Sequence, residues 1–233
     1  MGGWSPETAA RWLAEAVETG NPLAALPEEI APRDLPQAEE VSAAVLDALG
    51  IAPCGLRLLR REDGTVLAGP MVEGRLVPSG AAVALRSIRH PVATAAVVGV
   101  LAAPLEPGDD APPAFARLHP AIDIAATRFT EAPADAVALT ADLGRLGLVV
   151  AGKGKALPPG PLRIALGLKE GRRRGQEMDI AAALAEAGRA ARAWGGLPAG
   201  ALLVVAGLTP PAAAEGRLRA SLGALGGAEV LFS

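Results

Sequence analysis

The hydrophobic pattern of this 233-residue chain changes at Gly50. Before Gly50, apolar residues recur at the three- and four-residue spacing of amphipathic helices. After it, short runs of Val, Leu and Ile alternate with Gly, Pro and Asp, which is typical of strands joined by turns. Eight such runs span 55–60, 65–72, 81–87, 93–101, 148–151, 162–166, 201–206 and 228–232. The pattern predicts a helical portion over 1–50 and a β-rich body over 51–233.

Four helices are predicted in this arrangement. The first covers 5–19, with Ser5 as the N-cap, Pro6 in the first turn and Gly20 as the stop. The second runs from Leu35 to Leu49, and two more interrupt the strands at 133–146 and 177–193. Because strands and helices do not alternate regularly, the fold class is expected to be α+β.

The composition limits the partners of the chain. Hydrophobic residues make up 51% but aromatic residues only 3%, so few side chains could stack on nucleic-acid bases. The net charge of −3 offers no general attraction to nucleic acid or to an anionic membrane. A basic run at 172–174 is interpreted as a solvated loop, with an anion or partner contact as the alternative.

One cysteine and two histidines cannot build a zinc cluster or an internal disulfide. The N-terminal segment carries charges throughout, unlike a signal peptide, and no apolar run reaches membrane-spanning length. We expect a soluble protein of the cytoplasm.

Three segments, taken in order, resemble a known family. Residues 118–129 (LHPAIDIAATRF) resemble the "HPAIEI..SR(Y/F)" segment of 2-keto-4-pentenoate hydratases and their decarboxylase relatives. Residues 194–211 are similar to the family's "G..L.aGd.VltGslt.p", and residues 225–232 to its closing "lGsV.v.F" strand. Weaker similarities lie at 55–58 and 69–71. The ordered set covers most of the chain and is similar to the hydratase and oxalocrotonate decarboxylase branch of the fumarylacetoacetate hydrolase superfamily.

The resemblance implies a mixed, rolled β-sheet body with an N-terminal helical portion, assembled as a homo-oligomer or paired with a paralogue. It also implies Mg²⁺ or Mn²⁺ held by three carboxylates, with the ion chelating a small 2-oxo acid. A hard cation suits such lyase chemistry because it stabilises the enolate that forms as water is added or CO₂ is lost.

The metal ligands implied by the resemblance are largely missing. Two of them come from a Glu-x-Glu strand, whose equivalent here is 91–100, and the expected ligand positions are Ala93 and Ala95. Methyl groups cannot coordinate an ion, and no acidic residue lies between Arg75 and Leu105. Asp123 keeps the third carboxylate. We expect no metal cofactor of the family type.

Five residues are candidates for a site. His119 and Asp123 could act as general acid and base, and Arg57, Arg128 and Thr209 could bind substrate. Each has a structural alternative: an ion pair for the two arginines, a hydrogen bond before Pro120 for His119, and a strand-end turn for Thr209.

Two functions remain open at this point. The first is a hydratase-like protein with a pocket for a small 2-oxo acid and with its metal chemistry lost or rebuilt, including a metal-free variant that uses His119 and Asp123. The alternative is a noncatalytic subunit that binds a small anion or pairs with an active paralogue. An open pocket beside the 91–100 strand favours a ligand, and a filled apolar core favours a dead site.

Overall fold

The computed structural model describes residues 4–171 and 174–233, so Arg172 and Arg173 of the basic run lie outside the described residues. Its helices are α1 (Pro6–Thr19), α2 (Leu35–Leu49), α3 (Ala136–Ala141) and α4 (Ile180–Ala193). The sequence prediction of α1 and α2 is confirmed. Gly20 and Gly50 end these helices in the left-handed conformation, which glycine adopts without steric cost. None of the described helices is long and apolar enough to cross a membrane.

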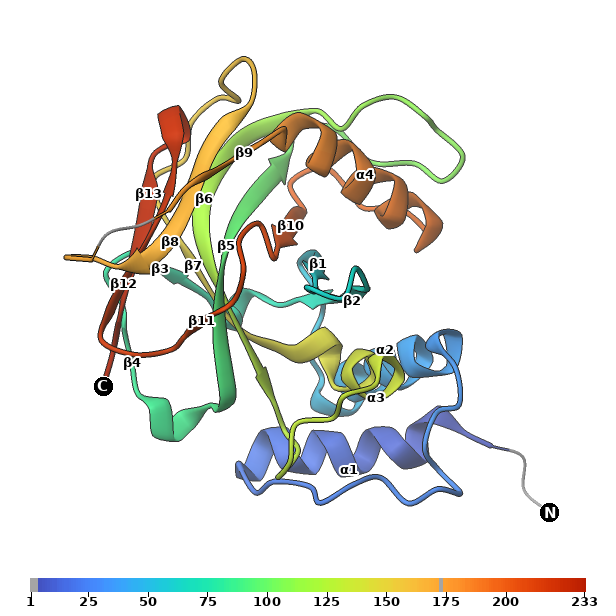
Figure 1. The fold of residues 1–233 in the computed structure, drawn as a ribbon. Helices are drawn as coiled ribbons and strands as arrows, with labels where there is room; N and C mark the ends of the chain where they lie inside the picture. The colour runs from blue at the N-terminus through green and yellow to red at the C-terminus, as the bar shows by residue number, and fades with distance from the viewer. Residues whose placement is uncertain (1–3, 172–173) are drawn as a thin grey trace.

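A large mixed sheet forms the centre of the molecule (Figure 1). Its strand order is β2-β1-β10-β5-β6-β7-β3, and β11 pairs with β5 beside this path. The strands are β1 (Gly55–Arg60), β2 (Val66–Met71), β3 (Leu76–Pro78), β5 (Arg89–Leu101), β6 (Phe115–Thr127), β7 (Leu146–Ala151), β10 (Leu202–Ala206) and β11 (Ala212–Ala213). The two longest, β5 and β6, form an antiparallel pair at its centre.

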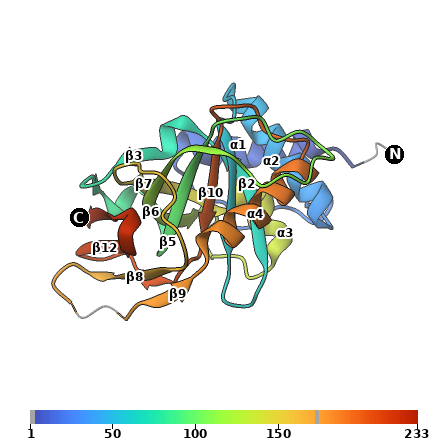
Figure 2. The same cartoon turned by 90° about the horizontal axis from the view of Figure 1, so that it is seen from above.

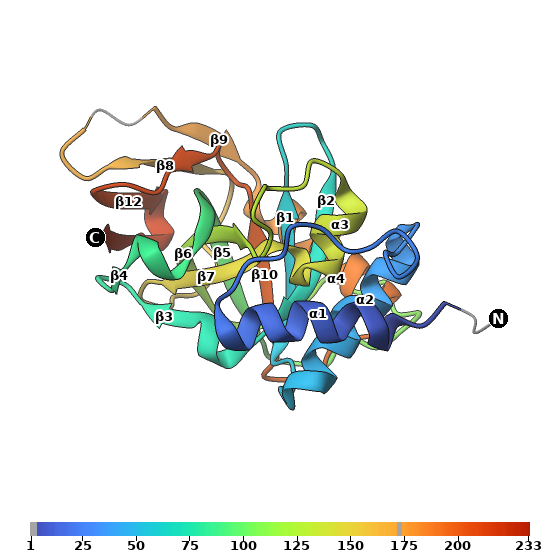
Figure 3. The same cartoon turned by 90° about the horizontal axis from the view of Figure 1, so that it is seen from below.

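A second sheet has the strand order β4-β13-β12-β8-β9. Its strands are β4 (Ala82–Val83), β8 (Leu162–Leu168), β9 (Gln176–Met178), β12 (Arg217–Leu222) and β13 (Gly227–Phe232). Figure 2 shows α4 lying across the strands of the large sheet, and Figure 3 shows α1 and α2 on another side.

Two hydrophobic clusters cover the two faces of the large sheet. On one face, α1 and α2 bury Leu13 and Val45 against residues such as Val98 of β5. On the other face, α4 and the second sheet pack Leu184 and other residues against Val97 of β5. Each fully buried aliphatic side chain of this size contributes about 1.5–3 kcal/mol. Because neighbouring residues of β5 enter different cores, the register of this strand decides which side chains can meet.

The segment after α3 differs from the predicted helix over 133–146. The α-helix ends at Ala141, and a short 3₁₀ turn, η3 (Leu143–Arg145), follows it. All three residues of η3 are left-handed, with φ of 54°, 59° and 61°. A right-handed helix cannot continue through such residues, and a non-glycine residue held there costs about 1–3 kcal/mol. The turn brings the backbone of η3 against β2, where a Cβ at Gly69 would lie 2.6 Å from the Leu143 carbonyl oxygen.

Other element boundaries also differ from the prediction. The predicted helix at 177–193 begins at Ile180, because Asp179 caps it and residues 176–178 pair with β8 as β9. The predicted strand at 81–87 keeps only the two residues of β4. Residues 115–127, which the strand pattern did not include, form β6.

Candidate functional site

A buried ion pair joins β1 to β6 across the large sheet. The Arg57 Nε and Nη2 atoms each donate a hydrogen bond of 2.6 Å to the two carboxylate oxygens of Asp123. Its Nη1 donates to the carbonyl oxygen of Gly144 in η3 at 2.7 Å. Both side chains have no exposed surface. The guanidinium therefore neutralises the Asp123 charge and occupies both of its carboxylate oxygens.

The register of β5 against β6 decides what faces Asp123. Thr94 lies directly opposite Asp123, while Ala93 and Ala95 lie opposite Ile124 and Ile122. Opposite residues of an antiparallel pair project on the same face, and successive residues project on opposite faces. The prediction that Ala93 and Ala95 face Asp123 is therefore wrong by one residue. Their methyl groups lie in the core on the other face of the sheet.

The residues of β5 on the face of Asp123 are Val92, Thr94 and Ala96. None of them carries a carboxylate. Within residues 4–171 and 174–233, no three His, Cys, Asp or Glu side chains gather where they could hold a metal ion. Mg²⁺ takes oxygen ligands in octahedral geometry, and here both oxygens of the Asp123 carboxylate accept a hydrogen bond from the Arg57 cation. The donor set does not fit the metal that the resemblance implies.

A cavity of about 550 Å³ opens beside Thr94, the residue that lies opposite Asp123. The residues that line the cavity lie on the strand ends and loops around Thr94. They are Leu59, Arg60, Arg61, Glu62, Asp63, Val92, Thr94, Arg145, Gln176, Gly207, Thr209, Pro210 and Pro211. Thr94 Oγ1 accepts a hydrogen bond from the Gly207 amide at 3.0 Å, and Thr209 Oγ1 accepts one from the Ala95 amide at 3.1 Å. Since both hydroxyls are acceptors in these bonds, their own hydrogens remain available to a ligand.

Within the described part of the chain, Arg145 is the one cation lining this cavity that forms no ion pair. The neighbouring Arg60 pairs with Glu186, and Arg61 pairs with Asp63. Arg145 donates from Nη2 to the His90 carbonyl oxygen at 3.1 Å, but its buried Nε has no hydrogen-bond partner among the described residues. Burial, and then the charge of Arg57, lowers the pKa of Arg145 below its ordinary range. A bound anion would accept a hydrogen bond from the Arg145 Nε and would oppose the lowering of the Arg145 pKa.

The other predicted site residues lie apart from this cavity. The ring of His119 forms a hydrogen bond of 2.9 Å between Nδ1 and the Gly152 carbonyl oxygen. It stands four residues before Asp123 on the same strand, or about 13 Å along an extended chain. The structure thus brings Thr209 to the cavity and Arg57 to Asp123, and does not bring His119 to either.

Arg128 has a different acid partner, Asp142. Its Nη1 lies 3.2 Å from Asp142 Oδ1, and its Nη2 donates to the carbonyl oxygen of Leu146. Asp142 is buried and also accepts from the Thr127 hydroxyl at 2.6 Å. Burial raises the pKa of Asp142, which Arg128 and Thr127 partly offset. The sequence patterns did not predict Arg145 or Asp142. Arg145 belongs to the left-handed turn η3 and Asp142 directly precedes it, and no local pattern marks such a turn.

The arrangement of sheets and helices is the fold of the fumarylacetoacetate hydrolase superfamily, and the prediction of that α+β fold is confirmed. No family model and no curated protein matches the chain. Among solved structures, it is similar to 4-oxalocrotonate decarboxylase from Pseudomonas putida G7 complexed with magnesium and adipate. That comparison has a TM-score of 0.80 at 18% identity and covers 98% of this chain and 97% of the other.

Two further structures support the same fold. The decarboxylase complexed with calcium and acetate gives a TM-score of 0.77 at 19% identity, again over 98% of this chain and 97% of the other. The 2-hydroxyhepta-2,4-diene-1,7-dioate isomerase from Mycobacterium marinum gives 0.54 at 9% identity, over 78% of this chain and 76% of the other.

Proposed function

We propose that this chain is a hydratase- or decarboxylase-like protein that binds a small 2-oxo acid without a metal ion and lacks the metal-dependent lyase activity of the proteins it resembles. The observation that carries the proposal is the bidentate bond between Arg57 and Asp123, both fully buried. A metal would have to displace this guanidinium, and the protein would then bury an uncompensated cation.

The loss of activity follows from the chemistry of the replacement. A divalent ion chelates a 2-oxo acid through two oxygens and stabilises an enolate as a Lewis acid. The Arg57 guanidinium donates hydrogen bonds to Asp123 and Gly144, and the Asp123 carboxylate neutralises its charge. It therefore has no open coordination position for a substrate and little net charge with which to stabilise an enolate. The ion pair keeps the two strands in place but supplies no equivalent of the metal.

Binding of a carboxylate rests on the cavity. Arg145 supplies the positive charge, and the hydroxyls of Thr94 and Thr209 supply neutral donors. The decarboxylase with the TM-score of 0.80 binds adipate, a small dicarboxylate. A cavity of about 550 Å³ lies within the usual size range for a small-molecule site, so a short aliphatic 2-oxo acid fits this class of ligand.

Titration calorimetry on the native chain tests the proposal. Pyruvate, 2-oxopentanoate and adipate are titrated with Mg²⁺ and again with EDTA. We expect binding of at least one of them, with equal affinity in both conditions. Arg145→Gln should weaken it about tenfold or more, because it removes a charge-assisted hydrogen bond. Arg33→Gln, the same change at an exposed arginine that does not line the cavity, should leave it unchanged.

Stoichiometric binding of Mg²⁺ or Mn²⁺, together with lyase turnover that EDTA abolishes, would refute the metal-free site. If none of the three acids binds, the cavity is not a carboxylate site. The alternative of a noncatalytic assembly subunit would then be tested by light scattering of the chain alone and with an active paralogue.

A further inference from the structure

A second pocket gathers four arginines between the end of α1 and the large sheet. Its volume is about 160 Å³, and its polar lining comes from Asn21, Arg75, Arg86, Ser87, Arg89, Thr127 and Arg128. No acidic residue lines it, although the chain has 25 acidic residues against 22 basic ones. It shares no lining residue with the cavity beside Thr94.

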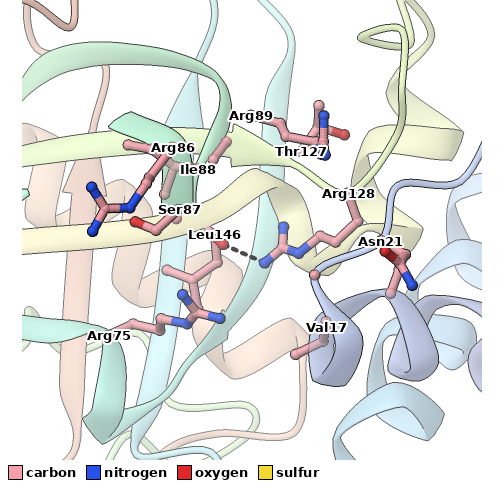
Figure 4. A pocket seen from close by; sticks show the side chains of 14 residues that line it. Val17, Asn21, Arg75, Arg86, Ser87, Ile88, Arg89, Thr127, Arg128 and Leu146 are labelled. Atoms are coloured by element: carbon pink, nitrogen blue, oxygen red, sulfur yellow. Dashed lines mark hydrogen bonds between the residues drawn. The ribbon is translucent and has the colours of Figure 1, made fainter. Parts of the chain in front are cut away.

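The arginines reach the pocket from separate parts of the chain. Arg75 ends the 3₁₀ turn before β3, and Arg128 follows β6. Arg86 lies shortly before β5, and Arg89 is the first residue of β5. Figure 4 shows the guanidinium groups of Arg75 and Arg128 directed toward the same space beside Leu146. Arg86 and Arg89 are exposed and form the rim, whereas Arg75 and Arg128 are only partly exposed. Tertiary structure has therefore concentrated positive charge at one point.

Among the residues that the structure describes, three of the four arginines form no ion pair. Arg128 is paired with Asp142. Within the described part of the chain, no hydrogen bond or ion pair engages the side chains of Arg75, Arg86 and Arg89. Burial, and then the charge of Arg128, lowers the pKa of Arg75. Like charges held this close in a partly buried site destabilise one another unless an anion lies between them.

We infer that this pocket binds a small oxyanion, either inorganic phosphate or the carboxylate end of a short acid. The guanidinium fork matches the oxygens of both groups with two parallel hydrogen bonds. Ser87, Asn21 and Thr127 place neutral polar groups on the same lining. The volume is well below the usual range for drug-sized ligands, so a nucleotide or a cofactor does not fit inside it.

The pocket is also linked to the segment that holds the central ion pair. Arg128 contacts Asp142 and Leu146, which flank η3, and Gly144 of η3 accepts from Arg57. An anion bound to Arg128 therefore lies next to η3, the turn whose Gly144 carbonyl oxygen accepts a hydrogen bond from Arg57. Anion binding in the arginine-lined pocket, however, does not require a ligand in the cavity beside Thr94.

Calorimetry at low ionic strength tests the site, with phosphate in one arm and succinate in the other. We expect one site for at least one of these anions, and the arm that binds identifies the ligand class. Arg75→Gln should weaken the binding about tenfold or more, and Arg89→Gln about threefold or more. Arg33→Gln, a matched loss of charge at an exposed residue that does not line the pocket, should have no effect. Circular dichroism confirms that each variant is folded, and Arg89→Gln tests the site even if Arg75→Gln does not fold.

Failure of both anions to bind would overturn the inference, as would equal binding by the native chain and both pocket variants. A third outcome is an acidic side chain of a second copy filling the pocket. Light scattering would then show an oligomer that Arg75→Gln dissociates while neither anion binds, and this result also overturns the site. Because the pocket variants leave Thr94, Arg145 and Thr209 intact, 2-oxo acid binding in the central cavity can succeed or fail independently.

Discussion

Replacing Arg57 with methionine should expose the cost of the buried ion pair. The substitution leaves the Asp123 carboxylate with no cation and no exposed surface, and it leaves the Gly144 carbonyl without its donor. Breaking a buried pair by removing one partner costs about 3–5 kcal/mol. For a chain of this length, with an unfolding entropy of about 2 cal/mol/K per residue, this is a decrease in Tm of about 6–10 °C. Urea denaturation and differential scanning calorimetry measure the two quantities.

The double variant Arg57→Met/Asp123→Leu is the control. Replacing a buried ion pair by apolar residues of similar volume is often neutral or stabilising, so the double variant should recover most of the lost stability. If Arg57→Met alone lowers the free energy of unfolding by less than about 1 kcal/mol, then the pair behaves like a solvent-exposed ion pair. The argument that the Arg57 guanidinium takes the place of a metal is then refuted.

Two further predictions concern the backbone and the second buried acid. Gly55→Ala should destabilise the fold by about 1–3 kcal/mol or more in urea denaturation, because its Cβ would lie 1.9 Å from the Leu202 carbonyl oxygen. Gly74→Ala, which meets no atom within 4 Å, should change stability by less than about 0.5 kcal/mol, and equal effects would contradict the β1 and β10 packing. Burial raises the pKa of Asp142 above its ordinary 3.8, so between pH 3.8 and the folded-state pKa the folded chain keeps a proton that the unfolded chain has released. The stability that this group contributes is therefore complete below pH 3.8 and is lost as pH rises through the folded-state pKa. The unfolding free energy of the native chain minus that of Asp142→Asn should fall as pH rises from 3.8 through the folded-state pKa, and a difference that grows with pH would contradict this assignment.

Local patterns predicted part of the fold correctly. The limits of α1 follow from Pro6 in the first turn and from Gly20, whose left-handed conformation ends the helix, and both act without a distant contact. Ser5 stands at the N-cap position, but its side chain makes no capping hydrogen bond. By contrast, the predicted helix over 133–146 is too long. The left-handed residues of η3 are fixed by packing against β2 and by the bond from Gly144 to Arg57, and neither contact is visible in the local sequence.

The candidate site was likewise predicted only in part from the sequence. Arg57, Asp123 and Thr209 were found through the family resemblance, but Thr94 and Arg145 of the cavity were not. The resemblance also assigned Ala93 and Ala95 to the face of Asp123, where the structure has Thr94. A strand alternates its faces with every residue, so an error of one position moves a side chain from the site into the opposite core.

By itself, the sequence determined that this chain has two helices before Gly50, a β-rich body after it, and no carboxylate between Arg75 and Leu105 that could bind a metal. Tertiary structure alone decided that Arg57 neutralises Asp123, that Arg145 faces a cavity, and that Arg75 and Arg128 share a second pocket. The limits of a helix and the absence of acidic residues from a segment can be read from residues close together in the chain. Charge pairing depends on strand register and chain reversal, which join residues dozens of positions apart.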